Sequence, residues 1–277
     1  MLSTIIPIAS AFLAAIAGIL ARVLLKDTPA KKMLSINFLI MGATLLVISP
    51  FFYKFTASWQ SVSIVLLIAI IDTLGNYFYF KTFEKTEASI ALPLLSLAPV
   101  VTFFFGAIIL NEYTSILKII SSLVIVVLII VISIDWNELP KFRKATLYPA
   151  LISAFLFGLS AIPSKYLLST IHAINAPTLY MFRAILIGIF ALMFLKNSLS
   201  NLKTKTYGFI FIRGLFVIGQ WILLYYAITL GNTGVAVTLG NITPIFVLFL
   251  SLIFLKEKFN WKKALAAIAI LAISFTL

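Results

Sequence analysis

The sequence predicts an all-α polytopic membrane protein with ten transmembrane helices, arranged as two inverted five-helix repeats. Two observations lead to this prediction: an extremely apolar composition, and a motif that recurs 145 residues later. Of the 277 residues, 62% are apolar and only 10% are charged, and the mean hydropathy is +1.16. A water-soluble surface needs far more charge, so the composition excludes a soluble globular protein.

Ten apolar segments are long enough to cross roughly 30 Å of hydrocarbon. They lie at 3–24, 33–52, 62–82, 88–110, 115–134, 147–168, 176–195, 207–228, 233–255 and 261–277. Backbone amides inside hydrocarbon must be hydrogen-bonded within the protein, which leaves only helices or closed barrels. Because these runs lack the alternation of barrel strands, each segment is predicted to be a helix.

The second half of the chain repeats the first. "LAPVVTFFFGAIILNEY", Leu97 to Tyr113, aligns without gaps with "ITPIFVLFLSLIFLKEK", Ile242 to Lys258, and "SAFL" at Ser10 recurs at Ser153. An odd number of helices in each copy forces the second copy to enter the membrane in the opposite direction. We therefore expect five-helix units at 1–138 and 139–277, joined near the charged segment 135–144.

Basic residues are distributed unequally between the two sides. The connections after odd-numbered helices contain sixteen of them, Arg22, Lys26, Lys31, Lys32, Lys81, Lys85, Lys141, Arg143, Lys144, Lys196, Lys203, Lys205, Lys256, Lys258, Lys262 and Lys263. Those after even-numbered helices contain three, Lys54, Lys118 and Lys165. Since positive charge near helix ends stays in the cytoplasm, the odd connections are predicted to be cytoplasmic and both termini to be outside.

The segment from Tyr225 to Ala272 resembles the drug/metabolite transporter superfamily, in particular its ten-helix branch with two EamA-type repeats. The resemblance rests on an aromatic-Ala-hydrophobe turn, small residues, a mid-helix proline and a Leu-x-Glu end, and it extends over the whole chain. The first half matches less well, with Lys81 opposite Tyr226 and an added Pro93. The resemblance implies a secondary transporter of small metabolites, amino acids or drugs. It also implies cytoplasmic termini, the reverse of what the charge distribution predicts.

Two prolines that match between the repeats mark a candidate central site. Pro99 and Pro244 each remove an amide donor and displace the carbonyl four residues earlier, at Leu95 and Gly240. Such carbonyls are tolerated at membrane depth where protein or a wet cavity satisfies them, so the prolines either line a substrate site, together with Asn241, or form packing kinks.

Asp72 is the acidic residue well inside a predicted span, and Asn76 and Tyr79 follow on the same helical face. A carboxylate at this depth costs about 2.5–3.5 kcal/mol on insertion scales, so it requires a partner or a cavity. Arg213, in the corresponding helix of the other repeat, is the expected partner. The same helix supplies three further candidate binding residues, Gln220, Trp221 and Tyr225. Asp72 and Arg213 therefore form either a structural ion pair or a substrate and proton site.

Arg183 lies roughly 10 Å into the seventh span by helical rise. We expect its long side chain to reach the interface, in a gating or interfacial role. Small residues at Ala150, Ala154 and Gly158 predict close helix contacts in the sixth span.

The composition also limits the function. The chain has no cysteine, which excludes disulfides and zinc thiolates, and no Gly-Lys-Ser phosphate loop, which argues against an ATP-driven pump. Basic residues flank apolar spans rather than forming one face, so nucleic acid is not an expected partner. The sequence predicts no catalytic residues, metal or cofactor.

The favoured function is a secondary transporter in the cell (inner) membrane that moves a small organic metabolite, an amino-acid-like solute or a drug, by alternating access. Amino acid export is one such activity. The expected partners are a small-molecule substrate and the lipid bilayer, in a monomer or homodimer. The alternatives are an intramembrane enzyme acting on a lipid or prenyl substrate, or a membrane scaffold without transport activity.

Orientation can be tested because the chain is free of cysteine. When an impermeant maleimide is added to whole cells, a single cysteine near the N-terminus is expected to react. A single cysteine at Lys141 is expected to be protected. A protected N-terminus with a reactive Lys141→Cys would reverse the predicted orientation.

Overall fold

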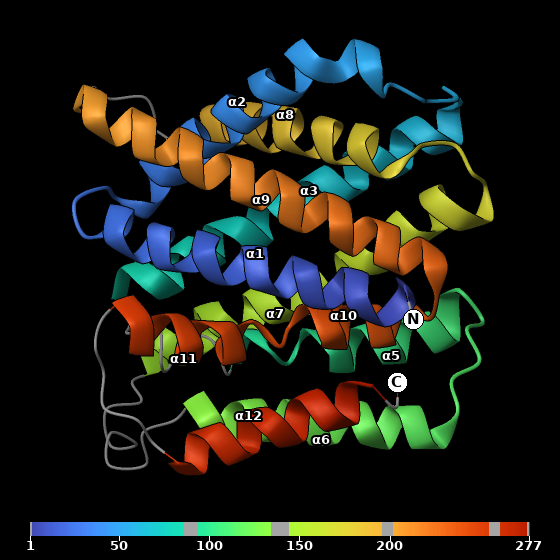
Figure 1. Cartoon of the computed structure of the whole chain (residues 1–277). Coiled ribbons are helices and arrows are strands. Elements are labelled where there is room, and N and C mark those ends of the chain that lie inside the picture. Colours follow the sequence, from blue (N-terminus) through green and yellow to red (C-terminus); the bar gives the residue numbers. More distant parts are fainter. Residues whose placement is uncertain (1, 86–93, 134–143, 196–201, 255–260, 276) are drawn as a thin grey trace.

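The computed structural model describes residues 2–85, 94–133, 144–195, 202–254, 261–275 and 277. The described chain is almost entirely helical (Figure 1). The first repeat contains α1 (Leu2–Leu25), α2 (Ala30–Ile48), α3 (Trp59–Lys85), α5 (Ala98–Ile109) and α6 (Ile116–Ser133). The second contains α7 (Lys144–Lys165), α8 (Ala176–Phe194), α9 (Thr204–Leu230), α10 (Thr233–Gly240), α11 (Thr243–Phe254) and α12 (Trp261–Ser274).

The ten predicted segments correspond to these helices, with α10 and α11 sharing the ninth, so the predicted fold class is confirmed. Short 3-10 and π turns extend α2 and α7, at Ser49–Phe51 and Tyr166–Thr170. Asparagines cap two of the helices: the side chain of Asn175 accepts a hydrogen bond from the Thr178 amide, and that of Asn232 accepts one from Val235. The cap satisfies amides that a helix start leaves without a partner. The predicted linker, 135–144, and the boundary at 138 lie almost wholly outside the described residues.

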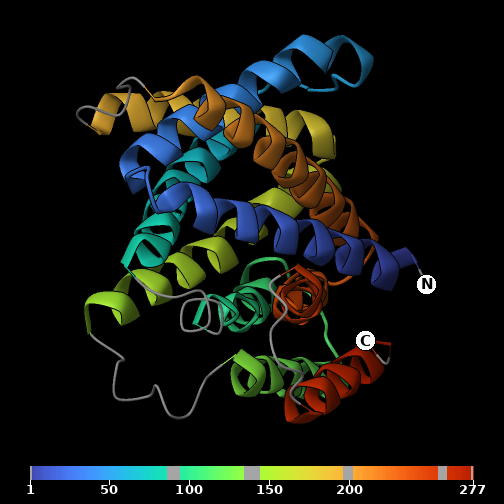
Figure 2. The same ribbon diagram turned by 60° about the vertical axis from the view of Figure 1, so that its left-hand side comes forward.

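The packing has an internal symmetry. The helix pair α1 and α9 corresponds to α7 and α3 when the two repeats are exchanged, and both pairs are in close contact. When the repeats are exchanged, α2 and α8 take each other's places, and so do α6 and α12; the helices of both pairs are in contact. The pair of α6 and α12 lies at one edge of the molecule (Figures 1 and 2). The recurring "SAFL" serines make equivalent bonds: Ser10 donates to the Gln220 carbonyl at 2.8 Å, and Ser153 donates to the Gly75 carbonyl at 3.0 Å.

The helix interruptions fall close to the two matched prolines. The ninth span is not continuous, because α10 ends at Gly240 and α11 begins at Thr243, which makes Pro244 the second residue of a new helix. In the first repeat, a turn at Ser96 and Leu97 precedes α5, and Pro99 is again the second residue. Proline is favoured at such positions because the first amides of a helix have no intrahelical acceptor.

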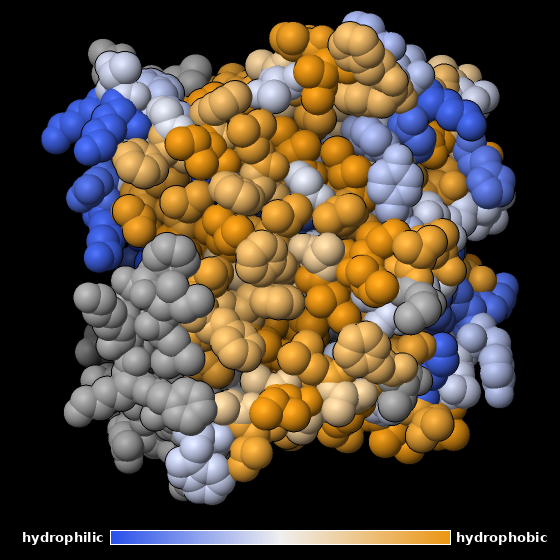
Figure 3. Space-filling view, viewed as in Figure 1, coloured by the Kyte–Doolittle hydropathy of each residue, from blue (hydrophilic) through white to orange (hydrophobic). Residues whose placement is uncertain are grey.

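The face shown in Figure 3 is apolar across its middle, and hydrophilic residues gather toward the two ends of the helices. Large apolar side chains on several helices are exposed there and elsewhere, including Phe12, Leu67, Val127 and Phe249. This distribution is that of a multi-pass integral membrane protein whose exposed middle meets lipid.

The predicted small-residue contact in the sixth span lies between α7 and α5. Ala150 and Ala154 are buried, and a Cβ added at Gly158 would lie 2.5 Å from the Ala98 carbonyl oxygen. Thr102 donates to the Gly158 carbonyl at 3.1 Å across the same contact. The absence of a side chain at Gly158 therefore allows α5, with its helix break, to lie directly against α7.

We expect Gly158→Ala to destabilise the protein by roughly 1–3 kcal/mol, because the added methyl group must separate α7 from α5. Gly208→Ala is the matched control: no atom lies within 4 Å of the Cβ position, so the change should be neutral or slightly stabilising. Thermal unfolding in detergent, followed by circular dichroism, measures both. Equal melting temperatures for the two variants would show that the close approach has no energetic consequence.

Candidate substrate cavity

A cavity of about 530 Å³ lies between the two repeats. Its walls come from α1, α2, α3, α5 and α7 through α11, whereas α6 and α12 contribute no lining residue. The size is within the range of small-molecule binding sites, about 300–1,000 Å³. Nine predicted site residues line it: Asn76, Tyr79, Arg183, Arg213, Gln220, Trp221, Tyr225, Asn241 and Pro244.

Two other predicted site residues lie behind the wall. Pro99 is buried at the start of α5, and its neighbours Ser96 and Ala98 reach the cavity instead. Asp72 is fully buried and is not a lining residue, but Ser160 and Arg183, which lie beside its carboxylate, both line the cavity.

The predicted pairing of Asp72 with Arg213 is wrong. Asp72 Oδ2 forms an ion pair with Arg183 Nε, which joins α3 to α8. The expected interfacial position of Arg183 is wrong as well, because only 1% of its side chain is exposed. Helical spacing places residues on faces within one helix, but it does not reveal that α3 packs against α8; this contact brings the two charges together and makes snorkelling unnecessary.

Aromatic rings surround the Arg183 guanidinium on its cavity side. The ring of Trp221 is 4.5 Å from the guanidinium carbon and that of Tyr225 is 5.1 Å from it. Tyr180 stacks on Trp221 with an interplanar angle of 12° and lies 6.0 Å from the same carbon. Cation–π contacts of this kind contribute about 2 kcal/mol when desolvated. Tyr180 was missed from sequence, although it lies three residues before Arg183, on the same helical face.

Arg213 is held by neutral acceptors. Its Nη1 donates to Asn37 Oδ1 at 2.7 Å, and its Nε donates to the Ala17 carbonyl at 3.2 Å. The Phe80 ring lies 5.3 Å from the guanidinium carbon. Asn37, which is fully buried, was not singled out from sequence; the signal that could have indicated it is a carboxamide side chain within an apolar span.

The interruption of the ninth span contributes directly to the cavity wall. Gly240, Asn241, Thr243 and Pro244 all line the cavity. Thr243 Oγ1 donates to the Gly240 carbonyl at 3.3 Å, and Asn241 Nδ2 donates to the Val237 carbonyl at 2.8 Å. The carbonyl that Pro244 displaces is thus satisfied by a neighbouring hydroxyl, and irregular backbone at this depth borders a cavity, as membrane proteins require.

The two ends of the cavity differ. At one end it extends to the exposed residues Arg22 and Val23 of α1 and to Lys26, which follows this helix. At the other end its lining residues Ser10, Ser164 and Ile228 are at most 1% exposed. Among the described residues, the cavity is therefore open on the side of the 26–29 connection and closed on the side of the 110–115 connection.

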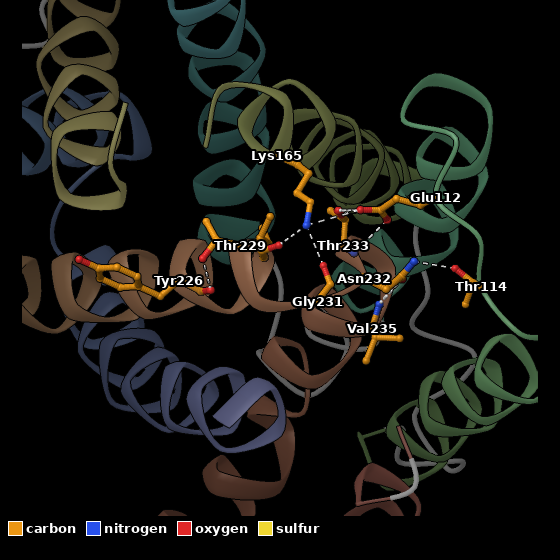
Figure 4. A network of polar contacts seen from close by, with 10 residues as sticks. Glu112, Thr114, Lys165, Tyr226, Thr229, Gly231, Asn232, Thr233 and Val235 are labelled. Atoms are coloured by element: carbon orange, nitrogen blue, oxygen red, sulfur yellow. Dashed lines mark hydrogen bonds and ion pairs between the residues drawn. The ribbon is translucent and has the colours of Figure 1, made fainter. Parts of the chain in front are cut away.

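A polar cluster covers the closed end (Figure 4). Lys165 Nζ donates to the carbonyls of Ile228 and Gly231 at 2.6 and 2.8 Å and lies 3.8 Å from Glu112 Oε1. Glu112 accepts hydrogen bonds from the Thr233 amide at 3.0 Å and from its hydroxyl at 2.6 Å. Because Lys165 belongs to α7 and Glu112 follows α5, the cluster ties both repeats to the turn between α9 and α10. Glu112 lies three residues after the end of α5; Glu257, which matches it in the second repeat, lies outside the described residues.

A helical membrane protein built around a cavity between two repeats belongs to the class of membrane transporters, and comparison with known proteins agrees. Residues 2–134 and 145–277 each match the EamA-like transporter family, so the chain belongs to this family. An uncharacterized transporter of Archaeoglobus fulgidus is 23% identical over 205 residues, which cover 73% of this chain and 71% of that protein. A solved crystal structure aligns with 98% of this chain and 94% of its own, with a TM-score of 0.78 and 14% identity, which shows the fold alone.

The ion pair can be tested by a double-mutant cycle. Asp72→Asn and Arg183→Gln should each destabilise the protein by about 3–5 kcal/mol, because each leaves an uncompensated buried charge. The double variant should be destabilised by less than the sum of the two single effects, giving a coupling energy of roughly 1–3 kcal/mol.

The control cycle combines Asp72→Asn with Arg213→Gln, for which additive effects are expected because Asp72 contacts Arg183. Unfolding in urea within detergent micelles measures both cycles. Coupling to Arg213 but not to Arg183 would contradict the observed pairing.

Proposed function

We propose that the protein is a secondary transporter that moves a small organic solute by alternating access. The observation that favours this most is the cavity of about 530 Å³, walled by both repeats, open at one end among the described residues and covered by a polar cluster at the other. A transporter needs such a site, open to one side at a time.

The internal symmetry supports the mechanism. If the two repeats enter the membrane in opposite directions, exchanging their conformations would close the accessible end and open the covered end without changing the fold. The equivalent helix pairs and the equivalent serine bonds of Ser10 and Ser153 are what such a relation requires. The solute would bind midway, at the level of the broken ninth span.

An amino-acid-like solute was expected to meet Asp72 and Arg213 with its two charges. Since Asp72 lies behind the cavity wall and is paired with Arg183, the cavity offers Arg213 directly and Asp72 only after the ion pair opens. The class of solute is therefore better derived from the charges that line the cavity.

The cluster at the closed end should control access from that side. A cysteine at Ser164, which is buried and lines the cavity, reports whether water-soluble reagents reach the site. With this background, Glu112→Gln removes the charge that accepts two hydrogen bonds from Thr233, so we expect maleimide labelling from the side of the 110–115 connection to accelerate by roughly tenfold.

The matched control is Glu84→Gln, which removes the same charge at the other end of the molecule, where Glu84 accepts a long 3.4 Å bond from the Ala30 amide. It should leave labelling from the closed side unchanged. Right-side-out and inside-out vesicles distinguish the two sides. Equal and rapid labelling from both sides in the parent Ser164→Cys protein would indicate a pore and contradict alternating access.

A further inference from the structure

We infer that the cavity takes an organic monocarboxylate, whose carboxylate binds the Arg213 guanidinium while its apolar body lies along α9 beside Val217 and Trp221. This inference rests on the proposed transport function and specifies the class of solute. It follows from the charges on the cavity wall, the partners of Arg213, and the apolar surface next to it.

The charged residues of the cavity wall are all basic. Arg22, Lys26, Arg183 and Arg213 line the cavity, and among its described lining residues there is no aspartate or glutamate. Asp72 lies behind the wall, and its negative charge is paired with Arg183. In the deep part of the cavity, one positive charge, that of Arg213, therefore remains without a carboxylate partner among the described residues.

The partners of Arg213 satisfy hydrogen bonds but not charge. Asn37 Oδ1 and the Ala17 carbonyl are both neutral, and the arginine is only 4% exposed. A buried guanidinium without a counter-ion is unfavourable inside a membrane protein. The guanidinium has five N–H donors in a planar fork; these two contacts and the Tyr79 hydroxyl, which also lies against it, use at most three of them, so donors suited to a carboxylate remain.

The two buried arginines differ in the partners that the helices of the other repeat supply. The ion pair of Arg183 and Asp72 joins α8 to α3, and the Arg213–Asn37 bond joins α9 to α2, the same two helices after exchange of the repeats. The arginines lie on opposite members of these exchanged pairs, Arg183 on α8 and Arg213 on α9, and they differ in their partners: that of Arg183 is a carboxylate, whereas that of Arg213 is the neutral amide of Asn37. The second arginine is left to be neutralised by an anion from the cavity.

The wall beside Arg213 is largely apolar along α9, where Gln220 is the polar exception. Val217, Trp221 and Leu224 follow it on the cavity face of α9, and Phe80 lies against the guanidinium. The distance from Arg213 to Trp221 along the helix is roughly 12 Å, which leaves room for an aromatic or branched body beside the carboxylate. The exposed Arg22 and Lys26 at the accessible end would attract anions toward this site.

The same wall disfavours cations and zwitterions. An ammonium group in the cavity would meet no carboxylate on the described wall, and it would be repelled by Arg213 and by the basic residues at the accessible end. An amine or an amino acid should therefore bind more weakly than the acid with the same apolar body.

The test uses purified full-length protein in nanodiscs and matched ligands. Binding of benzoate, 4-methylpentanoate and indole-3-acetate is compared by calorimetry with that of their primary amides, and indole-3-acetate also with tryptamine and tryptophan. We expect at least one acid to bind about tenfold or more tightly than its amide. Tryptamine and tryptophan should bind more weakly than indole-3-acetate.

Asn37→Asp is the decisive variant, because it supplies Arg213 with a carboxylate while retaining the arginine. It should fold at least as stably as the wild type, judged by thermal unfolding, and lose the preference for acid over amide. Arg213→Gln should lose the same preference, and Glu84→Gln should keep it. An acid preference that survives in a folded Asn37→Asp protein, equal binding of every acid and its amide, or tryptophan binding as tightly as indole-3-acetate would each overturn the inference.

Uptake into proteoliposomes separates this inference from the proposed function. Binding of the acids without uptake would leave the anion site standing and refute transport. Uptake of the neutral amides with no preference for the acids would leave transport standing and refute the anion site.

Discussion

The structure depends above all on how two guanidinium groups are accommodated inside an apolar helical bundle. Arg183 is compensated by a buried carboxylate and by three aromatic rings, and Arg213 is held by an amide and a backbone carbonyl. Each set of contacts joins a helix of the first repeat to a helix of the second. The polar contacts therefore hold the two halves together at the level where the cavity lies, and they determine which surfaces of the helices can face lipid.

The second constraint is the requirement that interrupted backbone remain hydrogen-bonded. Pro244 begins a new helix rather than bending an old one, and hydroxyl and amide side chains next to it satisfy the carbonyls that are released. Gly158 lets the equivalent segment of the first repeat approach α7 closely enough for Thr102 to bond across the contact. The broken helices are thus stable because they are packed on one side and border the cavity on the other.

Lys165 and Glu112 belong to a third set of contacts, at the closed end. Their side chains are about 15% exposed, and their hydrogen bonds converge on the turn between α9 and α10. In the proposed mechanism, partly hydrated contacts of this kind are weak enough to break, whereas the fully buried pair of Asp72 and Arg183 holds. The difference in burial separates contacts that can change from contacts that hold the fold.

Sequence alone determined the properties that depend on composition and local order. The apolar segments predicted the ten helical segments, seven of which are long enough in the described chain to cross a membrane, and the recurring "SAFL" and proline motifs predicted the two repeats. Four residues of α9 that were singled out from sequence all line the cavity: Arg213, Gln220, Trp221 and Tyr225. Tertiary structure alone decided the partners. The packing of the helices decides whether Asp72 contacts Arg183 or Arg213, and whether Arg183 reaches the interface. It also places Asn37 beside Arg213 and Tyr180 beside Arg183. Residues of one helix are related by a fixed geometry that can be read from their spacing, but the pairing of helices that are distant in sequence is selected by the complementarity of whole surfaces.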